Sequence, residues 1–327
     1  MKTKLKKLLV DLNVDLLLKK LNKTPRVLFW HGVDDIENPD VEAETFDVVN
    51  FKKQVEYLVK NYEIISIDEF YIRLKENKFT NKEVVLTFDD GYSNNLYKVA
   101  PILNNLSLPF TVFISTEHIE TGELYPTSIA RLIILGSDLN SISIPSISIY
   151  DFDITTNELK HKLYTIVSME LKSRPLTEVR KIVQNLIDNL NKTEYLNIIE
   201  KYNSVKPMNW DEVVKLKKMG ATIGSHCKYH ICCHENQNVE IVKDQIIESK
   251  RIIEAKLQTY CHYFAYPNGD YTEDSNLFVK EAGYKLGFST DKNQKVSEYT
   301  DKTIIPRIGV PQNIDTFKLF INIYPKK

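Results

Sequence analysis

Two short stretches of the sequence hold the residue types that metal-dependent hydrolysis needs. In VVLTFDDGYS the adjacent carboxylates Asp89 and Asp90 follow an apolar run, and in GSHCKYHICCHE the histidines His226 and His230 are four residues apart. One carboxylate and two imidazoles are a common protein ligand set for catalytic zinc, which keeps a fourth position open for water. The second carboxylate stays free to act as a base. Each stretch alone has an ordinary alternative, because Asp-Asp-Gly also forms turns that cap helices, and exposed histidine pairs are frequent.

The histidine-rich stretch also permits a zinc site that is built on sulfur. Its ligands would come from residues within the stretch and from a second pair further along the chain, namely Cys227, Cys232, Cys233, His234, Cys261 and His262. Structural zinc sites use such paired ligands. The plainest alternative is that the cysteines are small buried hydrophobic residues. Three of the four cysteines lie within seven residues, which is a poor disulfide framework and favours a reducing compartment.

The composition is that of a folded protein with an ordinary surface charge. Of 327 residues, 43% are hydrophobic and 27% are charged, which is enough to bury a sizeable core as one large domain or two small ones. The formal net charge is −1. We therefore expect no nucleic-acid partner, since such proteins usually carry a strongly basic surface.

Residues 1–24 are expected to form an amphipathic helix, because leucines recur at helical spacing between clusters of lysines. The apolar runs in this segment are about three residues long, whereas a secretory signal needs roughly 7–15 apolar residues and a membrane span about 20. We therefore expect a cytoplasmic protein without a signal peptide or transmembrane helix. Two arrangements stay open for the helix: packing on the protein's own surface, or peripheral contact with an anionic membrane.

Short β-rich runs alternate with helical patterns along most of the chain. The expected strands are 26–31, 84–90, 110–116, 221–226, 262–267, 286–290 and 303–308. The expected helices are 50–62, 94–106, 209–220, 239–258, 272–283 and 313–323. This alternation indicates an α/β fold made of parallel βαβ units. Seven or so strands favour a barrel, although an open doubly wound sheet also fits.

One long segment interrupts the alternation. Residues 117–208 separate the third main strand from the helix that follows, whereas ordinary βα loops are about 2–6 residues long. We expect an insertion with its own structure, either a lid or a subdomain. The remaining main body would then comprise residues 25–116 and 209–327.

The polar residues are concentrated at the carboxyl ends of the expected strands. They are His31, Asp89, Asp90, His226, the YPNGD segment from Tyr266 to Asp270, and Arg307. In a parallel barrel the carboxyl ends of the strands share one rim, and active sites lie on that rim. The pattern of elements and the pattern of polar residues therefore indicate the same place for a site.

Taken together, these motifs resemble those of the polysaccharide deacetylase family, which is carbohydrate esterase family four with its NodB-homology domain. TFDDG, from Thr87 to Gly91, matches the first motif of that family, and SHCKYH resembles its second motif, His-[Ser/Thr]-x-x-His. FAYPNGDY is similar to the third motif in the branch that reads Phe-Ala-Tyr-Pro, while LFWHGV and PRIGV resemble the opening and closing segments. The resemblance covers residues 26–116 and 209–323.

The resemblance implies a distorted (β/α)7 barrel with a large insertion after its third main strand, and metal-dependent removal of an N-acyl group from an amino sugar. By their motif positions, the ligands of Zn²⁺, or of another divalent ion such as Co²⁺, Ni²⁺ or Mn²⁺, are Asp90, His226 and His230. Asp89 is the general base that activates a metal-bound water as nucleophile. The third motif places three residues on the substrate and oxyanion side of the site, namely Asn268 through its backbone amide, Tyr266 and Pro267.

Three departures from the family pattern change the expected roles. Cys227 stands where the family prefers Ser or Thr, so its thiol either supports the histidines weakly or crowds the metal. Ala265 replaces the arginine of the third motif, and we expect Arg307 to hold Asp89 ionised and oriented instead. The closing segment lacks the usual Leu-His, and His31 is the expected replacement as general acid. The alternative for His31 is a hydrogen-bonded structural residue.

The function predicted from these residues is removal of an N-acetyl group from an amino sugar in a saccharide or glycoconjugate. The conjugate could be lipid-linked or nucleotide-linked, and both substrates stay open. Two other functions also stay open. One is a deformylase or other amide hydrolase of the same fold, since substrate choice and chemistry reside in different parts of a site. The other is a catalytically inactive barrel that binds carbohydrate.

Overall fold

The structure is a computed structural model that describes residues 2–22, 24–290, 294–297 and 299–324.

The main sheet is a parallel barrel that is closed by one bent segment near the C-terminus, residues 305–309. Along this sheet the strand order is β12-β11-β10-β9-β6-β5-β1-β13, and the paired strands are parallel. These strands are β1 (Arg26–Trp30), β5 (Glu83–Phe88), β6 (Thr111–Ile114), β9 (Thr222–Ser225), β10 (Tyr263–Ala265), β11 (Leu286–Ser289), β12 (Ile305–Pro306) and β13 (Ile308–Gly309).

Arg307 alone separates β12 from β13, so one short segment pairs with β11 at its first half and with β1 at its second half. Counting that segment once gives a ring of seven parallel strands, which confirms the predicted distorted (β/α)7 barrel. All seven expected strands are present, each within a few residues of its predicted bounds. The open doubly wound sheet is excluded because the two ends of the strand order meet in one segment.

The strands read as continuous apolar runs because they are covered on both faces. All six residues of β5 are buried, and so are the four residues of β6 and of β11. Short strands complete the sheets: β4 (Glu63–Ile64) pairs with β5, and β2 (Gly32–Asp34) pairs with β3 (Thr45–Asp47).

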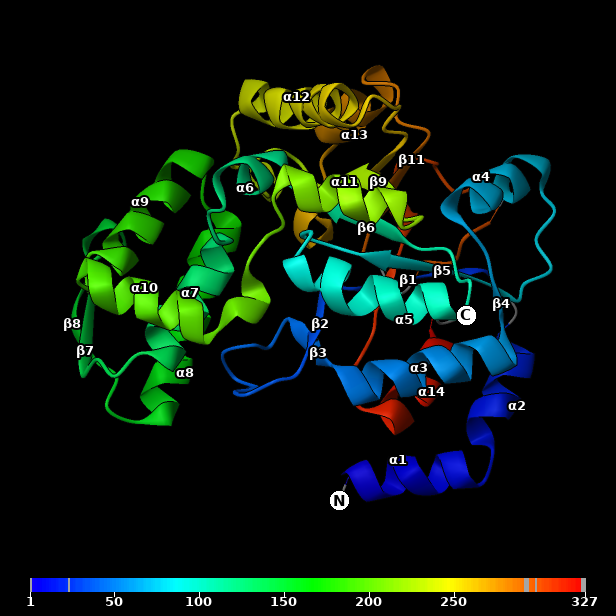
Figure 1. Cartoon of the computed structure of the whole chain (residues 1–327), viewed down its shortest axis with the longest axis horizontal. Helices are drawn as coiled ribbons and strands as arrows, with labels where there is room; N and C mark the ends of the chain where they lie inside the picture. Colours follow the sequence, from blue (N-terminus) through cyan, green and yellow to red (C-terminus); the bar gives the residue numbers. More distant parts are fainter. Residues whose placement is uncertain (1, 23, 291–293, 298, 325–327) are drawn as a thin grey trace.

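Helices surround the barrel (Figure 1), and the six that were predicted are all present. The outer helices are α3 (Val48–Asn61), α4 (Ile67–Glu76), α5 (Ala100–Asn105), α11 (Trp210–Lys218), α12 (Val239–Leu257), α13 (Glu273–Glu281) and α14 (Ile314–Ile323). The predicted helix 94–106 begins as a π-helical turn, η1 (Asn95–Val99), and Pro101 lies in the first turn of α5. η1 continues into α5, since the Ala100 N–H donates to the Asn95 carbonyl, so the missing N–H of Pro101 lies where π-helical bonding changes to α-helical bonding.

Most of the segment 117–208 forms a lobe, seen at the left of Figure 1, whereas its first helix lies beside the barrel and contacts α12. From the end of β6 it comprises α6 (Thr116–Thr121), α7 (Pro126–Gly136), β7 (Ser141–Ile144), η2 (Pro145–Ile147), β8 (Ile149–Asp153), α8 (Asn157–Ser173), α9 (Leu176–Ile187), α10 (Lys192–Lys201) and η3 (Asn203–Val205). The Ser- and Ile-rich run forms the antiparallel pair β7–β8. The lobe has its own hydrophobic cluster, to which Val41 and Tyr92 contribute from outside the segment.

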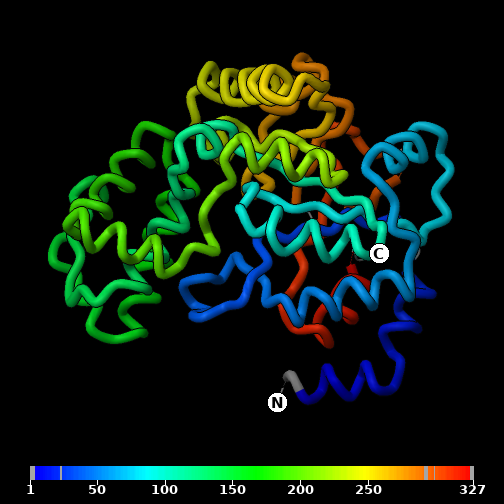
Figure 2. The backbone as a smooth tube through the Cα atoms, in the orientation of Figure 1, coloured from blue at the N-terminus to red at the C-terminus, as the bar shows by residue number. Residues whose placement is uncertain are grey.

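Where one helix was expected over residues 1–24, the described residues form two, α1 (Lys2–Asp11) and α2 (Val14–Leu21). The break lies at Asn13, whose φ of 56° is left-handed and cannot continue a right-handed helix. Both helices contact α14, and they lie at the edge of the molecule (Figure 2). The carboxylate of Asp15 is buried and accepts a hydrogen bond of 2.8 Å from the Tyr57 hydroxyl. In the described part of the chain, no helix combines the length and the apolar character that crossing a membrane requires.

Candidate active site

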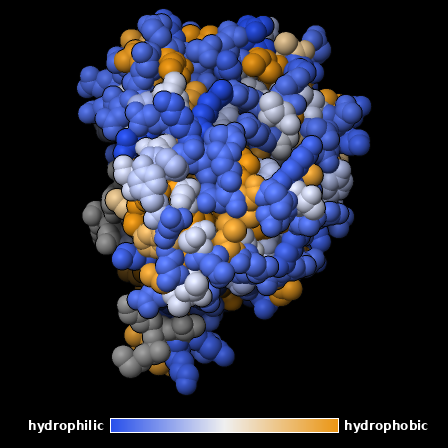
Figure 3. Space-filling model, turned by 90° about the vertical axis from the view of Figure 1, so that its left-hand side faces the viewer, coloured by the Kyte–Doolittle hydropathy of each residue, from blue (hydrophilic) through white to orange (hydrophobic). Residues whose placement is uncertain are grey.

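A cavity of about 300 Å³ lies where the carboxyl ends of the barrel strands face the insertion. The barrel side of its lining includes His31, Asp89, Asp90, His226, His230, Asn268 and Thr290. The insertion contributes Pro126, Thr127, Leu171, Lys172, Leu176 and Val179. The surface seen from the insertion side is mostly hydrophilic, with hydrophobic side chains gathered in its middle (Figure 3). The strand ends therefore meet in one place, and the insertion forms part of its wall.

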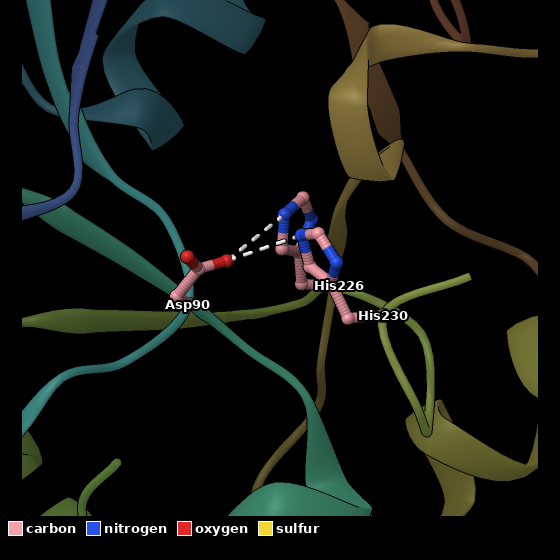
Figure 4. A group of neighbouring side chains, drawn as sticks. All are labelled: Asp90, His226 and His230. Carbon is pink, nitrogen blue, oxygen red and sulfur yellow. Dashed lines mark ion pairs between the residues drawn. The ribbon is translucent and has the colours of Figure 1, made fainter. Parts of the chain in front are cut away.

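Three of these residues converge on one point, as Figure 4 shows. Asp90 Oδ1 lies 3.2 Å from His230 Nε2 and 3.6 Å from His226 Nε2. The three ligand atoms lie within 4.8 Å of one another, and among the described residues this is the one such group of three His, Cys, Asp or Glu side chains. The spacing is short enough for one ion to contact all three.

Local backbone conformation directs these side chains. Asp90 and Gly91 both have a φ of 70°, so the chain turns sharply directly after β5. A side chain at position 91 would be strained there, and its Cβ would approach Ile114 to 2.7 Å. His226 directly follows β9, and His230 reaches the same point through a left-handed conformation with a φ of 51°. The Tyr125 hydroxyl also donates a hydrogen bond to the Asp90 carbonyl.

The donor set fits a divalent cation. Asp90 Oδ1 is buried, and no hydrogen bond among the described residues satisfies it, so a positive partner is expected there. His226 Nδ1 lies 2.7 Å from the Ala265 carbonyl, which assigns the proton to Nδ1 and leaves the Nε2 lone pair facing Asp90. Burial lowers the pKa of His226 to about 4, so its ring is neutral, as metal binding requires.

Asp89 lies beside this group and is held by Arg307. The guanidinium donates two hydrogen bonds of 2.7 Å, one to each carboxylate oxygen. Arg307 has no exposed surface, and its guanidinium lies 4.7 Å from the ring centre of Phe29 and 5.3 Å from that of Phe113. Burial alone would raise the pKa of Asp89, but the positive charge of Arg307 outweighs it and lowers the pKa. The carboxylate is therefore ionised and fixed in orientation.

His31 reaches the cavity from the end of β1. Its Nδ1 lies 3.5 Å from Glu44 Oε2, and its ring meets the edge of Phe29 at 5.7 Å between centres. The side chain is 23% exposed. The ring is thus accessible from the cavity, unlike the fully buried Arg307.

Of the three residues predicted on the substrate and oxyanion side, Asn268 lines the cavity, whereas Tyr266 and Pro267 do not. Asn268 lines the cavity and has a left-handed φ of 57° in the short turn η4 (Pro267–Gly269). The amides of Gly269 and Asp270 donate within this turn, to the carbonyls of Tyr266 and Pro267. Tyr266 and Pro267 are buried and are not part of the cavity lining.

The cysteines do not assemble into the alternative zinc site. All four are free and buried, and they belong to no ligand group among the described residues. Cys227 packs in the main hydrophobic core with Cys233, and burial raises the pKa of its thiol. The sulfur that lines the cavity is that of Cys232. The structure thus supports the interpretation of these residues as small hydrophobic groups.

Comparison with known proteins agrees with this geometry. The model of the polysaccharide deacetylase family matches residues 76–287, which is more than half of the chain. The chain belongs to the polysaccharide deacetylase family. As a family member it is a hydrolase that acts on amide carbon–nitrogen bonds. No curated protein matches the chain in sequence.

Solved structures of deacetylases share the fold at low sequence identity. PplD of Streptococcus pyogenes is 16% identical with a TM-score of 0.58, and the match covers 91% of this chain and 97% of PplD. IcaB of Ammonifex degensii is 14% identical with a TM-score of 0.57, covering 91% and 97%. The BpsB deacetylase domain of Bordetella bronchiseptica is 15% identical with a TM-score of 0.51, covering 88% and 96%.

Two charged residues of this polysaccharide deacetylase family member escape prediction from the sequence. Glu44 lines the cavity beside His31, and Arg131 in α7 of the insertion forms an ion pair with Glu44. Neither residue belongs to a motif, and they are 87 positions apart. Leu171, Leu176 and Val179 of the insertion also line the cavity. The sequence does not single them out, because their pattern is that of ordinary amphipathic helices.

Proposed function

We propose that the chain removes the N-acetyl group from an amino sugar in a saccharide or glycoconjugate, with a divalent cation held by Asp90, His226 and His230. The observation that carries this proposal is the bidentate pair of Asp89 and Arg307 beside that ligand set, in one cavity. An ionised carboxylate kept free of the ligand set is what a general base requires. The PplD structure is a complex with acetate, which is the acid that such a reaction would release.

A bound Zn²⁺, or another divalent ion such as Co²⁺, Ni²⁺ or Mn²⁺, supplies Lewis acidity, which lowers the pKa of water toward ~7 and polarises a carbonyl. Asp89 accepts the proton of the attacking water, and Arg307 keeps that carboxylate ionised between turnovers. The backbone amide of Asn268 donates to the developing oxyanion. His31 then protonates the leaving amine, which would otherwise be a poor leaving group.

The direct experiment measures acetate released from N-acetylhexosamine saccharides by the purified protein loaded with zinc or cobalt. The expected result is turnover by the wild type, turnover lowered about 10²–10⁴-fold in Asp89→Asn, and equal metal content in both. A folded, metal-loaded wild type that releases no acetate would overturn the proposal.

The same assay separates the alternative functions. Release of formate from an N-formyl sugar in preference to acetate would favour the deformylase. Saccharide binding without any turnover, unchanged in Asp89→Asn, would favour the inactive binding barrel, because a binder has no use for an ionised base.

We further propose that the substrate is lipid-linked rather than nucleotide-linked, and that α1 contacts an anionic membrane surface. Leu5 and Leu8 of α1 and Leu12 directly after it are spaced three and four residues apart, and their side chains are 57%, 53% and 65% exposed. The exposed Lys4 and Lys7 lie on the same short helix, and lysines beside exposed leucines are typical of helices that bind anionic lipid headgroups.

Co-sedimentation with vesicles tests this contact. The protein should bind phosphatidylserine-containing vesicles more strongly than neutral vesicles, and replacement of the three leucines by serine should abolish the difference. The matched control is Leu106→Ser, since Leu106 is an exposed leucine far from α1 in the sequence. Equal sedimentation of the triple variant and the wild type would contradict the proposal.

A further inference from the structure

A chain of charged contacts connects the insertion to His31. His31 Nδ1 lies 3.5 Å from one carboxylate oxygen of Glu44, and Arg131 of α7 donates to the other oxygen. The two oxygens of Glu44 therefore have different partners. The Arg131 side chain is 11% exposed, and the Glu44 side chain is 30% exposed.

Arg131 is itself held within the insertion. Its guanidinium lies 5.3 Å from the ring centre of Tyr164 in α8, a stacking arrangement that restricts the planar group. Arg131 also determines the charge of the Glu44 carboxylate, together with His31. Burial would raise the pKa of Glu44, but Arg131 and then His31 outweigh it and lower the pKa to about 2.

The loop that carries Glu44 is fixed to the insertion at other points. Val41 packs in the hydrophobic cluster of the insertion. The Ser204 hydroxyl, at the far end of the insertion, donates a hydrogen bond of 2.6 Å to Glu42. Glu42 in turn accepts the amides of Glu37 and Asn38 at 2.9 Å each. The position of Glu44 is thus determined by the insertion as much as by the barrel.

We propose that Glu44 and Arg131 are positioning residues for His31, so that the insertion is part of the catalytic apparatus rather than only a wall of the cavity. The Glu44 carboxylate, 3.5 Å from His31 Nδ1, favours the tautomer that carries its proton on Nδ1 and leaves Nε2 free to face the substrate. Arg131 holds Glu44 in place and keeps it charged. The inference rests on the proposed function, in which His31 protonates the leaving amine.

The first test is independent of activity. In ¹⁵N-histidine-labelled protein, the His31 signals are identified by their absence in His31→Gln. The wild type should show one tautomer protonated on Nδ1, whereas Glu44→Gln and Arg131→Met should show a mixture of tautomers. Unchanged His31 signals in both variants would overturn the positioning role, whatever the substrate of the protein is.

The second test compares two substrates. Amide hydrolysis needs protonation of the leaving amine, whereas hydrolysis of 4-nitrophenyl acetate does not, because nitrophenolate leaves unaided. Glu44→Gln and Arg131→Met should lower kcat for the N-acetyl amide about 10–100-fold more than for the ester, the range for loss of an outer-shell partner. Equal losses on the two substrates, or no loss, would contradict the proposal.

Two further variants separate positioning from general damage. In a Glu44→Gln background, Arg131→Met should change the amide-to-ester ratio by less than about twofold, since Arg131 acts through Glu44. The matched control is Arg174→Met, because Arg174 is also an insertion arginine that pairs with glutamates, Glu170 and Glu178, but does not contact Glu44. That control should leave both rates unchanged. Failure of the proposed function would instead appear as a wild type without amide hydrolysis but with the expected His31 tautomer.

Discussion

The two sides of the site that we propose to transfer protons are built in different ways. Asp89 directly follows β5 and Arg307 lies between β12 and β13, and Arg307 has no exposed surface. His31 and Glu44 are 23% and 30% exposed, and the arginine that completes this second group comes from the insertion. The proposed base, Asp89, is therefore oriented by the barrel alone, whereas the orientation of the proposed acid, His31, depends on how the insertion packs against the barrel.

This difference suggests how one fold can serve several substrates. A base that is fixed by the strands keeps the same geometry in any variant of the barrel. An acid that is oriented through the insertion changes together with the wall that contacts the substrate, so that proton delivery and substrate choice are coupled. Substitutions in the Asp89–Arg307 pair should therefore leave the orientation of His31 unchanged. Substitutions of Glu44 or Arg131 should leave the orientation of Asp89 unchanged.

The largest expected effect is on turnover. Asp89→Asn removes the base and should lower kcat by about 10²–10⁴-fold for both the amide and 4-nitrophenyl acetate. His31→Gln should show a large loss for the amide alone. Steady-state kinetics on the two substrates measures both effects. If His31→Gln lowers both rates equally, the assignment of distinct acid and base sides is wrong.

The proposed metal ligands Asp90, His226 and His230 come from the barrel, so substitutions in the insertion side should not change metal binding. His230→Ala removes one of three ligands and should reduce zinc affinity by more than the ~10–100-fold that loss of an outer-shell partner costs. Glu44→Gln should keep the wild-type zinc content, because Glu44 is not in the ligand group. Elemental analysis after dialysis against a mild chelator measures both. Undiminished zinc in His230→Ala would contradict the ligand set.

Stability should also distinguish the two arginines. Arg307→Met leaves Asp89 charged, buried and unpaired, which should lower the free energy of unfolding by about 3–5 kcal/mol. Arg131→Met leaves Glu44 partly solvated, and the expected loss is about 1.5–3 kcal/mol. Denaturant unfolding of the metal-free proteins compares them. Equal losses for the two variants would mean that the insertion side is as deeply buried in solution as the barrel side.

The smallest effect is a pH dependence of unfolding. The folded pKa of Glu44 is about 2, below the ordinary value of about 4.3 for a glutamate. The resulting stabilisation is fully present above about pH 4.3 and is lost as the pH falls through about 2. The difference in unfolding free energy between the wild type and Glu44→Gln should therefore narrow as the pH falls from 5 to 2. A difference that is constant over this range would contradict the ion pair.

The sequence predicts the barrel side of this molecule well. The seven strands are visible because each is a short apolar run buried on both faces, and their ends carry Asp89, Asp90 and His226. The ligand set lies within two short motifs, so local spacing is enough to find it. Arg307 is predictable for a related reason, because it lies at the end of the last strand and the third motif lacks its usual arginine.

The insertion side is not predictable in this way. The Ser- and Ile-rich run does not reveal its hairpin, and the leucine pattern of residues 1–24 does not reveal the break at Asn13. Glu44 lies in a loop without a periodic pattern, and Arg131 occupies an ordinary helical position. Their pairing depends on how the insertion folds back onto the barrel.

The strands, the rim of the barrel and the residues at that rim can be predicted from the sequence, since alternating patterns and short motifs are local properties of the chain. The pairing of each arginine with its carboxylate follows from the packing of the folded chain. That packing places Arg307 on Asp89 because one bent segment closes the barrel, and Arg131 on Glu44 because the insertion packs on the loop before β3. Contacts between residues far apart in sequence depend on packing, and no local pattern records them.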